Sequence, residues 1–257
     1  MKLADLLSEI KKTQIEIGAS EPYICGGTPR DKVMKNIKNI SDLDITTGDK
    51  TIDYLGQKFY DNLSKNFSIS KKLMPDGHTT IFFGNLKMDF SSNFNIPNID
   101  VFLNKIGIAN PSDMQREVYS RDFTCNCLLM SLDMKNILDV TKNGLNDIKN
   151  KKIKTCLPPE VTLITNKNRV ARAIYLAAKL DFDLDNSIIE YVKKYPETMK
   201  ISSNGVLVEK LNESFTKDGD KTSYYLTKMG LWNLIPVNEI AYPYYIKHVK
   251  KRPNVAK

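Results

Sequence analysis

The stretch that decides the fold reads GGTPRD at residues 26–31 and DLD at residues 42–44. The apolar residues before it are typical of a buried strand, and those after it predict a short helix over 32–37. A glycine turn between strand and helix leaves backbone N–H groups unpaired, and such groups favour phosphate. Asp42 and Asp44 are two residues apart, so on a strand both carboxylates lie on one face. Since Mg²⁺ shares oxygen ligands with substrate phosphates, the stretch predicts metal-assisted phosphoryl or nucleotidyl transfer.

Each half of this pattern is weak by itself, because an aspartate pair on an exposed strand is usually a solvated face. Together, GGxxRD followed by DxD resembles the signature of the class II tRNA nucleotidyltransferase and bacterial poly(A) polymerase superfamily. The family motif usually reads Gly-Gly-x-Val-Arg-Asp, and Pro29 stands where the valine is expected. The resemblance implies an α+β fold: a polymerase β-like nucleotidyltransferase head with a small mixed or antiparallel sheet, followed by an all-helical neck.

The resemblance also assigns roles to the residues of this first motif. It implies that Asp42 and Asp44 bind two Mg²⁺ ions. It implies that the nucleotide's phosphates are bound by Gly26, Gly27 and Arg30.

A third carboxylate is expected in the strand pattern at residues 86–90, where apolar and polar residues alternate. If this strand pairs near Asp42 and Asp44, Asp89 can serve as a third catalytic carboxylate. A solvated strand aspartate is an equal alternative.

The second motif reads SRDFTCNC at residues 120–127. In isolation it predicts a helix start with Ser120 as N-cap. It is similar to the family's Arg-Arg-Asp-Phe-Thr-x-Asn-Ala segment, which implies that the ribose is contacted by Arg121, Asp122 and Asn126. A 2′-hydroxyl donates and accepts hydrogen bonds, and Asp and Asn side chains can meet both needs.

Residues 161–179 have helical periodicity, and the family carries Glu-Asp-x-x-Arg at the start of this helix. Here the stretch reads TNKNR at residues 165–169, so threonine and asparagine replace both acids. The resemblance assigns nucleotide binding to Asn166, Arg169 and Arg172. An asparagine still offers one acceptor and one donor to a base edge, so the choice between ATP and CTP stays open.

The chain is expected to form two domains. Residues 1–153 would be the nucleotidyltransferase head, and residues 154–257 the helical neck and RNA-binding domain. We expect residues 94–113, which contain prolines and several asparagines, to be a loop. The tail carries a basic cluster that can contact RNA phosphates, although a solvated terminus is an equal alternative. This cluster is Lys250, Lys251 and Arg252.

The composition is that of an ordinary globular chain of 257 residues, 41% hydrophobic and 26% charged. The formal charge of +8 favours a polyanionic partner such as RNA. We expect a cytoplasmic protein, because residues 1–18 predict an amphipathic helix, not a signal peptide, and no long apolar run follows. The four cysteines lack metal-ligand spacing and are expected to be reduced.

The leading hypothesis is a nucleotidyltransferase that adds nucleotides from CTP and ATP to an RNA 3′ end, with tRNA as the RNA. The chain would be a short member that lacks most of the body and tail. Three alternatives stay open. They are an A-adding enzyme or poly(A) polymerase, an inactive RNA-binding relative, and, more distantly, a small-molecule nucleotidyltransferase.

Overall fold

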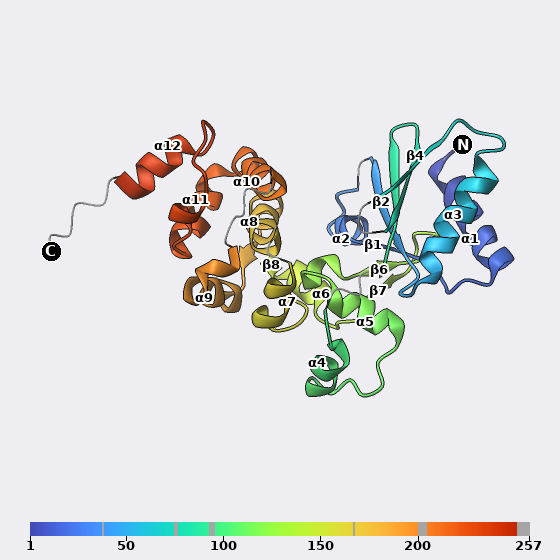
Figure 1. Cartoon of the computed structure of the whole chain (residues 1–257), viewed down its shortest axis with the longest axis horizontal. Coiled ribbons are helices and arrows are strands. Elements are labelled where there is room, and N and C mark those ends of the chain that lie inside the picture. Colours follow the sequence, from blue (N-terminus) through green and yellow to red (C-terminus); the bar gives the residue numbers. More distant parts are fainter. Residues whose placement is uncertain (38, 75–76, 93–95, 167, 200–204, 251–257) are drawn as a thin grey trace. The chain divides into compact units, whose positions relative to one another are not determined.

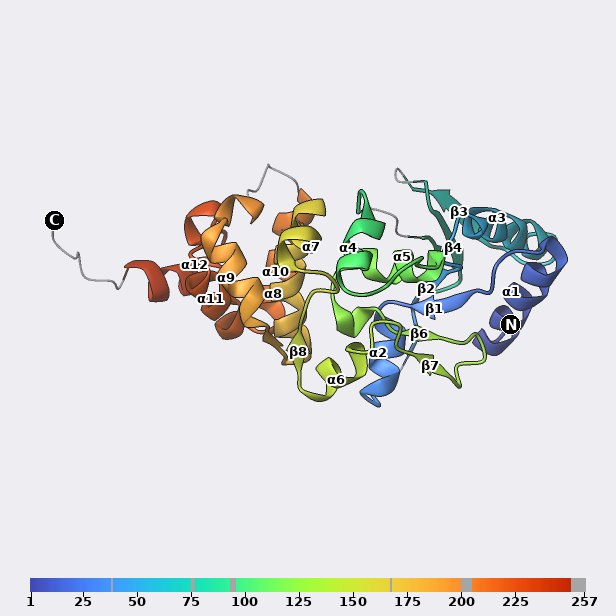
Figure 2. The same ribbon diagram turned by 90° about the horizontal axis from the view of Figure 1, so that it is seen from below.

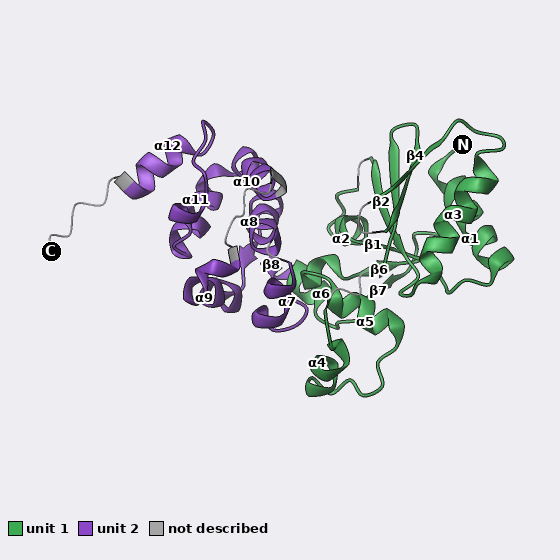
Figure 3. Cartoon of the chain, viewed as in Figure 1, with its two compact units in different colours: residues 1–148 green, residues 149–257 purple. Residues whose placement is uncertain are grey.

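The computed structural model describes the chain except residues 38, 75–76, 93–95, 167, 200–204 and 251–257. It divides into two units, residues 1–148 and 149–257 (Figure 3). The first unit ends at residue 148, five residues before residue 153, where the sequence predicts the end of the head domain. Within the described ranges, no helix reaches the length and apolarity that a bilayer crossing requires.

The first unit is built on one mixed sheet of seven strands in the order β3-β4-β5-β2-β1-β6-β7 (Figure 1). The strands β2 and β5 pair in parallel, and the other described neighbours in this sheet pair antiparallel. The expected mixed sheet is confirmed. The strands are β1 (Tyr23–Cys25), β2 (Asp42–Thr46), β3 (Ser70–Leu73), β4 (Thr79–Phe83), β5 (Leu86–Phe90), β6 (Leu129–Met130) and β7 (Ile137–Leu138).

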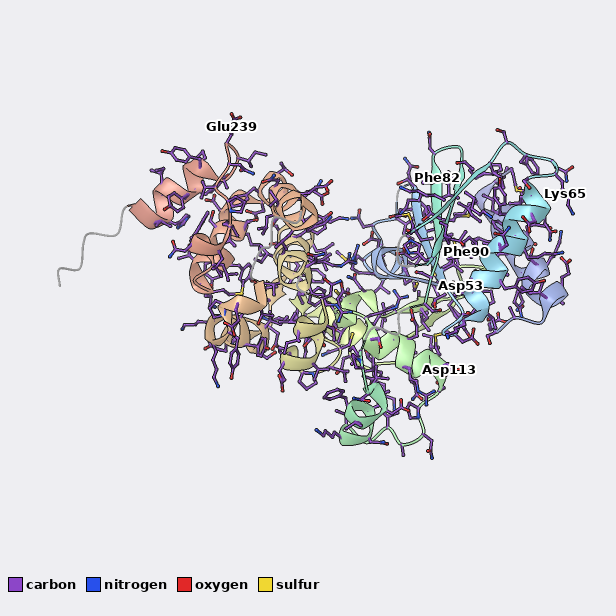
Figure 4. The ribbon with its side chains drawn as sticks, in the orientation of Figure 1. Asp53, Lys65, Phe82, Phe90, Asp113 and Glu239 are labelled. Atoms are coloured by element: carbon purple, nitrogen blue, oxygen red, sulfur yellow. The ribbon has the colours of Figure 1, made fainter. Side chains whose placement is uncertain are left out.

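Two amphipathic helices, α1 (Leu3–Ile17) and α3 (Thr51–Leu63), pack side by side over one face of this sheet (Figures 1 and 2). Their buried leucines, isoleucines and Phe59 recur at helical spacing and meet the apolar residues of the strands. The rings of Phe59 and Phe90 (the latter labelled in Figure 4) are 5.5 Å apart between centroids. Because strand side chains alternate between faces, burying Leu43, Ile45 and Phe90 here directs the strand aspartates to the opposite face.

The remaining helices of the first unit correct two expectations. The sequence predicts a loop over 94–113, but this stretch contains helix α4 (Ile99–Lys105). The sequence also predicts a helix start at Ser120, but Ser120 is the last residue of α5 (Asp113–Ser120). The N-cap of α5 is Ser112, whose hydroxyl accepts from the Gln115 backbone N–H at 3.2 Å in a capping box.

Three short helices complete the first unit. The helix after the glycine turn begins earlier than expected, at Gly27 instead of residue 32. These elements are α2 (Gly27–Val33), the 3₁₀ turn η1 (Thr124–Asn126) and α6 (Gly144–Lys149).

The second unit is mostly helical, as expected, and also contains a short parallel strand pair, β8 (Lys152–Ile153) and β9 (Asp183–Leu184). The single helix expected over 161–179 is two helices, α7 (Pro159–Thr165) and α8 (Asn168–Leu180). The later elements are α9 (Asn186–Lys194), η2 (Pro196–Met199), α10 (Gly205–Lys217), α11 (Gly219–Lys228), η3 (Trp232–Leu234), α12 (Tyr242–Tyr245) and a π-helical stretch, η4 (Ile246–Lys250).

Candidate active site

Three carboxylates gather on the sheet face opposite α1 and α3. The parallel register of β2 and β5 sets Asp44 directly beside Asp89. One oxygen from each of Asp42, Asp44 and Asp89 lies within 4.8 Å of the others. Of the two alternatives left open for Asp89, the structure shows the one in which it lies beside Asp42 and Asp44. Carboxylate oxygens at this spacing are a donor set that suits a hard divalent cation such as Mg²⁺.

Gly26 allows the Asp44 carboxylate to lie against the glycine turn. Its φ of +74° is in the region that L side chains rarely adopt. A Cβ at this position would lie 2.3 Å from Asp44 Oδ2, which is closer than any real contact. The glycine turn and the aspartate pair, expected to form one site from the sequence, are therefore in direct contact.

Lys87 neutralises part of this acidic cluster. It stands two residues before Asp89 on β5, so both side chains lie on one face. Its Nζ lies 2.5 Å from Asp89 Oδ2 and 3.5 Å from Asp42 Oδ1. Burial lowers the pKa of Lys87, but the hydrogen bond to Asp89 and the charges of Asp89 and Asp42 outweigh it and raise that pKa.

Asp89 is also held from the neighbouring strand β4. The hydroxyl of Thr80, directly opposite in the register, donates to Asp89 Oδ1 at 2.6 Å. His78 Nε2 lies 3.9 Å from the same oxygen. Lys87 and Thr80 are site residues that were not predicted from the sequence. Because residues 86–90 alternate along a strand, the sequence alone could have predicted that Lys87 shares a face with Asp89. The position of Thr80 opposite Asp89 is known only from the pairing of β4 with β5.

Arg30 joins the two sequence motifs. Its side chain is nearly fully buried, with 3% of the residue exposed. Nε donates to Asp31 at 2.8 Å, and one terminal nitrogen donates to Asn126 Oδ1 at 2.6 Å. A direct contact between Arg30 and a phosphate would therefore require these bonds to rearrange. In this structure the guanidinium positions the glycine turn against η1.

Asp122 and Asn126 lie at the same place. Asp122 Oδ1 accepts from the Phe123 backbone N–H at 2.8 Å and from Asn126 Nδ2 at 3.5 Å. Thr124, between them, donates to Asp147 Oδ2 at 2.6 Å. Gly144 packs so closely on this turn that a Cβ there would lie 2.6 Å from the Thr124 carbonyl oxygen. The second motif is thus a tightly bonded turn that presents Asp122 and Asn126 beside Arg30.

Arg121 is engaged with a buried acid that the sequence analysis missed. One terminal nitrogen donates to Glu117 Oε1 at 2.5 Å and lies 3.0 Å from the Cys25 sulfur. Glu117 is fully buried, one turn before Arg121, so the pair ties the end of α5 to β1. Burial raises the pKa of the Cys25 thiol to about 12 despite the opposing charge of Arg121.

The predicted base-reading residues lie in the second unit, where they form the junction between α7 and α8. Asn166 Oδ1 accepts from the Asn168 backbone N–H at 2.9 Å. Arg169 is buried and donates to the Thr162 carbonyl oxygen at 2.9 Å and to Thr165 Oγ1 at 3.1 Å. Arg172 is exposed on α8. The predicted RNA-binding residues Lys251 and Arg252, and the side chain of Lys250, lie outside the described residues.

A sequence model described as the Poly A polymerase head domain matches residues 22–154, just over half of the chain. This chain belongs to the poly A polymerase head-domain family. The match covers the seven strands of the first unit's sheet, the glycine turn and both motifs of the site. The family resemblance identified from the sequence is confirmed.

Curated relatives of this head-domain protein include two tRNA nucleotidyltransferases. A CCA-adding enzyme of Lactobacillus helveticus is 25% identical over 207 residues, 80% of this chain and 47% of that protein. An A-adding tRNA nucleotidyltransferase of Aquifex aeolicus is 24% identical over 204 residues, 76% of this chain and 23% of that protein. The chain thus spans less than half the length of either relative.

Solved structures share the fold. The Bacillus stearothermophilus CCA-adding enzyme in complex with CTP matches with a TM-score of 0.67 and 18% identity, over 90% of this chain and 53% of that one. A tRNA nucleotidyltransferase complexed with a primer tRNA and an incoming ATP analog matches with a TM-score of 0.65 and 21% identity, over 90% and 64%. At these identities the likeness establishes the fold of this head-domain protein.

Proposed function

We propose that this protein is a template-independent RNA nucleotidyltransferase that uses CTP and ATP to extend the 3′ end of tRNA. The observation that carries the proposal is the cluster of Asp42, Asp44 and Asp89 against Gly26. It occurs in a head-domain chain whose relatives are named as CCA-adding and A-adding enzymes. The basic charge of the chain suits a polyanionic partner, and the cytoplasm, where tRNA ends are made and repaired, is the proposed location.

In the proposed reaction, the RNA 3′-oxygen attacks the α-phosphorus of the nucleotide and pyrophosphate leaves. Asp42 and Asp44 would hold two Mg²⁺ ions, with Asp89 as a third ligand. Two bound ions would favour ionisation of the 3′-hydroxyl and neutralise the leaving pyrophosphate. The backbone N–H groups of the turn at Gly26 and Gly27 are the candidates for binding the triphosphate, since they open helix α2.

We assign the remaining site residues by their bonding. Asp122 and Asn126 are the candidates for the ribose, and the contact between Asn126 and Arg30 supports a fixed position for both. Arg30 and Arg121 act as positioning residues, since each guanidinium is buried and already paired. Their positive charges still make the site more favourable for phosphate.

In the second unit, taken by itself, three residues are the proposed candidates for contacts with a nucleotide. Arg172, which is exposed, is the candidate for a phosphate. Asn166 and Arg169 are the candidates for the base edge. The hydrogen bonds of Arg169 to Thr162 and Thr165 support a role that fixes the α7–α8 junction as well.

The proposal is tested with purified protein, Mg²⁺ and labelled CTP or ATP, supplied singly or one after the other, on tRNA that lacks its 3′-terminal CCA and on tRNA that ends in CC. Incorporation of CTP followed by ATP supports CCA addition. ATP addition only to tRNA that already ends in CC identifies an A-adding enzyme, and long ATP tails identify a poly(A) polymerase. RNA binding without incorporation of any nucleotide would identify an inactive relative and reject the proposal.

A further inference from the structure

Lys87 reaches into the carboxylate cluster from within β5. Its ammonium lies between two strands, 2.5 Å from Asp89 Oδ2 and 3.5 Å from Asp42 Oδ1. These are two of the three carboxylates that lie within 4.8 Å of one another. The ammonium therefore contacts two of the carboxylates that a divalent cation would use.

An ammonium and a metal ion compete for such oxygens. A lysine ammonium binds carboxylates through its hydrogen atoms, whereas Mg²⁺ needs the oxygen lone pairs at close range. Two cations at the same oxygens also repel each other. Binding of the metal ion therefore disfavours the ammonium at this place.

Lys87 has room to leave, whereas Asp89 is fixed. The Lys87 side chain is 40% exposed, and it is long and flexible, so its ammonium can move into solvent. Asp89 is buried and held by the Thr80 hydroxyl at 2.6 Å. Asp89 is thus the fixed member of this ion pair, and Lys87 is the mobile one.

We propose that Lys87 is an internal counter-cation: it occupies the space between Asp42 and Asp89 in the metal-free protein and is displaced when the divalent cation binds. This inference rests on the metal site of the proposed function and adds a specific residue to it. Lys87 would keep the acidic cluster neutralised without metal, at the expense of metal affinity.

The test is Mn²⁺ binding to the full chain, measured from the electron paramagnetic resonance signal of free Mn²⁺. Replacing the competing charge in Lys87→Met should tighten binding by roughly tenfold, the effect of one nearby charge in a partly exposed site. The matched control is Lys72→Met. Lys72 is aligned with Thr80, which is aligned with Asp89, so it shares the face of the cluster at two strand spacings. The Lys72→Met variant should bind Mn²⁺ with the affinity of wild type.

Binding by Lys87→Met that is no tighter than wild type overturns the inference, as does equal tightening in both variants. Asp42→Asn separates this failure from that of the proposed function. If Asp42→Asn weakens Mn²⁺ binding while Lys87→Met has no effect, only the role of Lys87 is wrong. If wild type does not bind Mn²⁺, both the inference and the proposed metal site are wrong.

A measurement on the wild-type protein covers the case in which Lys87→Met does not fold. A small amine-reactive ester modifies a lysine side chain once its ammonium group is free of partners and has lost a proton. Mass spectrometry measures the extent of modification at each lysine. Mn²⁺ should increase modification of Lys87 several-fold, because displacement removes its carboxylate partners, and should leave Lys72 unchanged. Unchanged or reduced modification of Lys87 contradicts displacement.

Discussion

Gly26 is the residue on which the geometry of the site depends most closely. It has a positive φ, and Asp44 Oδ2 occupies the space in which a Cβ would lie. Any side chain here must move the Asp44 carboxylate or the turn. A displacement of about 1 Å at a reacting centre is enough to cost roughly a hundredfold in rate.

Gly26→Ala should therefore lower the initial rate of nucleotide incorporation by about a hundredfold, with the chain still folded. Gly84→Ala is the matched control, because Gly84 also has a positive φ, but a Cβ added there would meet no atom within 4 Å. The control separates the backbone cost, which both variants share, from the clash with Asp44. Equal rates for the two variants would contradict the role given to Gly26.

At the scale of elements, Arg30 connects α2 to η1. It is bonded to Asp31 on its own helix and to Asn126 on the 3₁₀ turn. Breaking a buried charged contact costs more than breaking an exposed one, because the buried group that remains has no water to replace its lost partner. The contact of Arg30 with Asn126 is therefore expected to contribute to the free energy of unfolding.

A double-mutant cycle with Arg30→Lys and Asn126→Ala should give a coupling free energy of about 1 kcal/mol or more in urea unfolding. Arg116→Lys serves as the control. Arg116 forms ion pairs with Asp100 and Asp113 at the surface. Its replacement by lysine should change the free energy of unfolding by no more than about 0.5 kcal/mol. A coupling near zero would show that Arg30 does not hold the two motifs together.

The start of α3 depends on Asp49, which accepts from Thr51 N–H and from the hydroxyls of Thr47, Thr51 and Ser20. Burial raises the pKa of Asp49, but these hydrogen bonds outweigh it and lower that pKa. Its stabilisation is therefore present above the ordinary aspartate pKa and is lost as pH falls through the lowered value.

Asp49→Asn should lower stability at pH 7 by about 1 kcal/mol, and the difference from wild type should shrink below about pH 4. Thermal unfolding between pH 3 and pH 7 measures it. The control is Asp61→Asn, on the exposed side of the same helix. A difference that is independent of pH would contradict the role of the ionised carboxylate.

Several helix boundaries were not predicted from the sequence. The capping box at Ser112 and Gln115 can be recognised in the sequence as S-x-x-Q. The helix start was nevertheless predicted at Ser120, because the second motif also resembles an N-cap. The break between α7 and α8 could also be anticipated, since an asparagine that bonds the backbone two residues on favours a helix start. From periodicity alone the two helices were predicted as one, because both bury apolar residues at helical spacing.

At the scale of the whole molecule, the alternation of residues 86–90 placed Asp89 on the polar face of its strand, but only the pairing of β5 with β2 brings it to Asp42 and Asp44. The sequence did not predict the buried pairs of Arg30 and Arg121. Their partners, Asn126 and Glu117, are set by how α2, α5 and η1 pack on the sheet. Such tertiary contacts leave no periodic pattern in the sequence.

The central claim is that the chain transfers nucleotides at Asp42 and Asp44. The most direct test compares wild type with Asp42→Asn/Asp44→Asn in the incorporation of labelled CTP and ATP into tRNA lacking its 3′ end, at fixed Mg²⁺. Circular dichroism checks that the variant is folded. We expect wild type to incorporate both nucleotides and the variant to lose the activity by at least about a thousandfold. Equal incorporation by the folded variant would contradict the assignment of the active site.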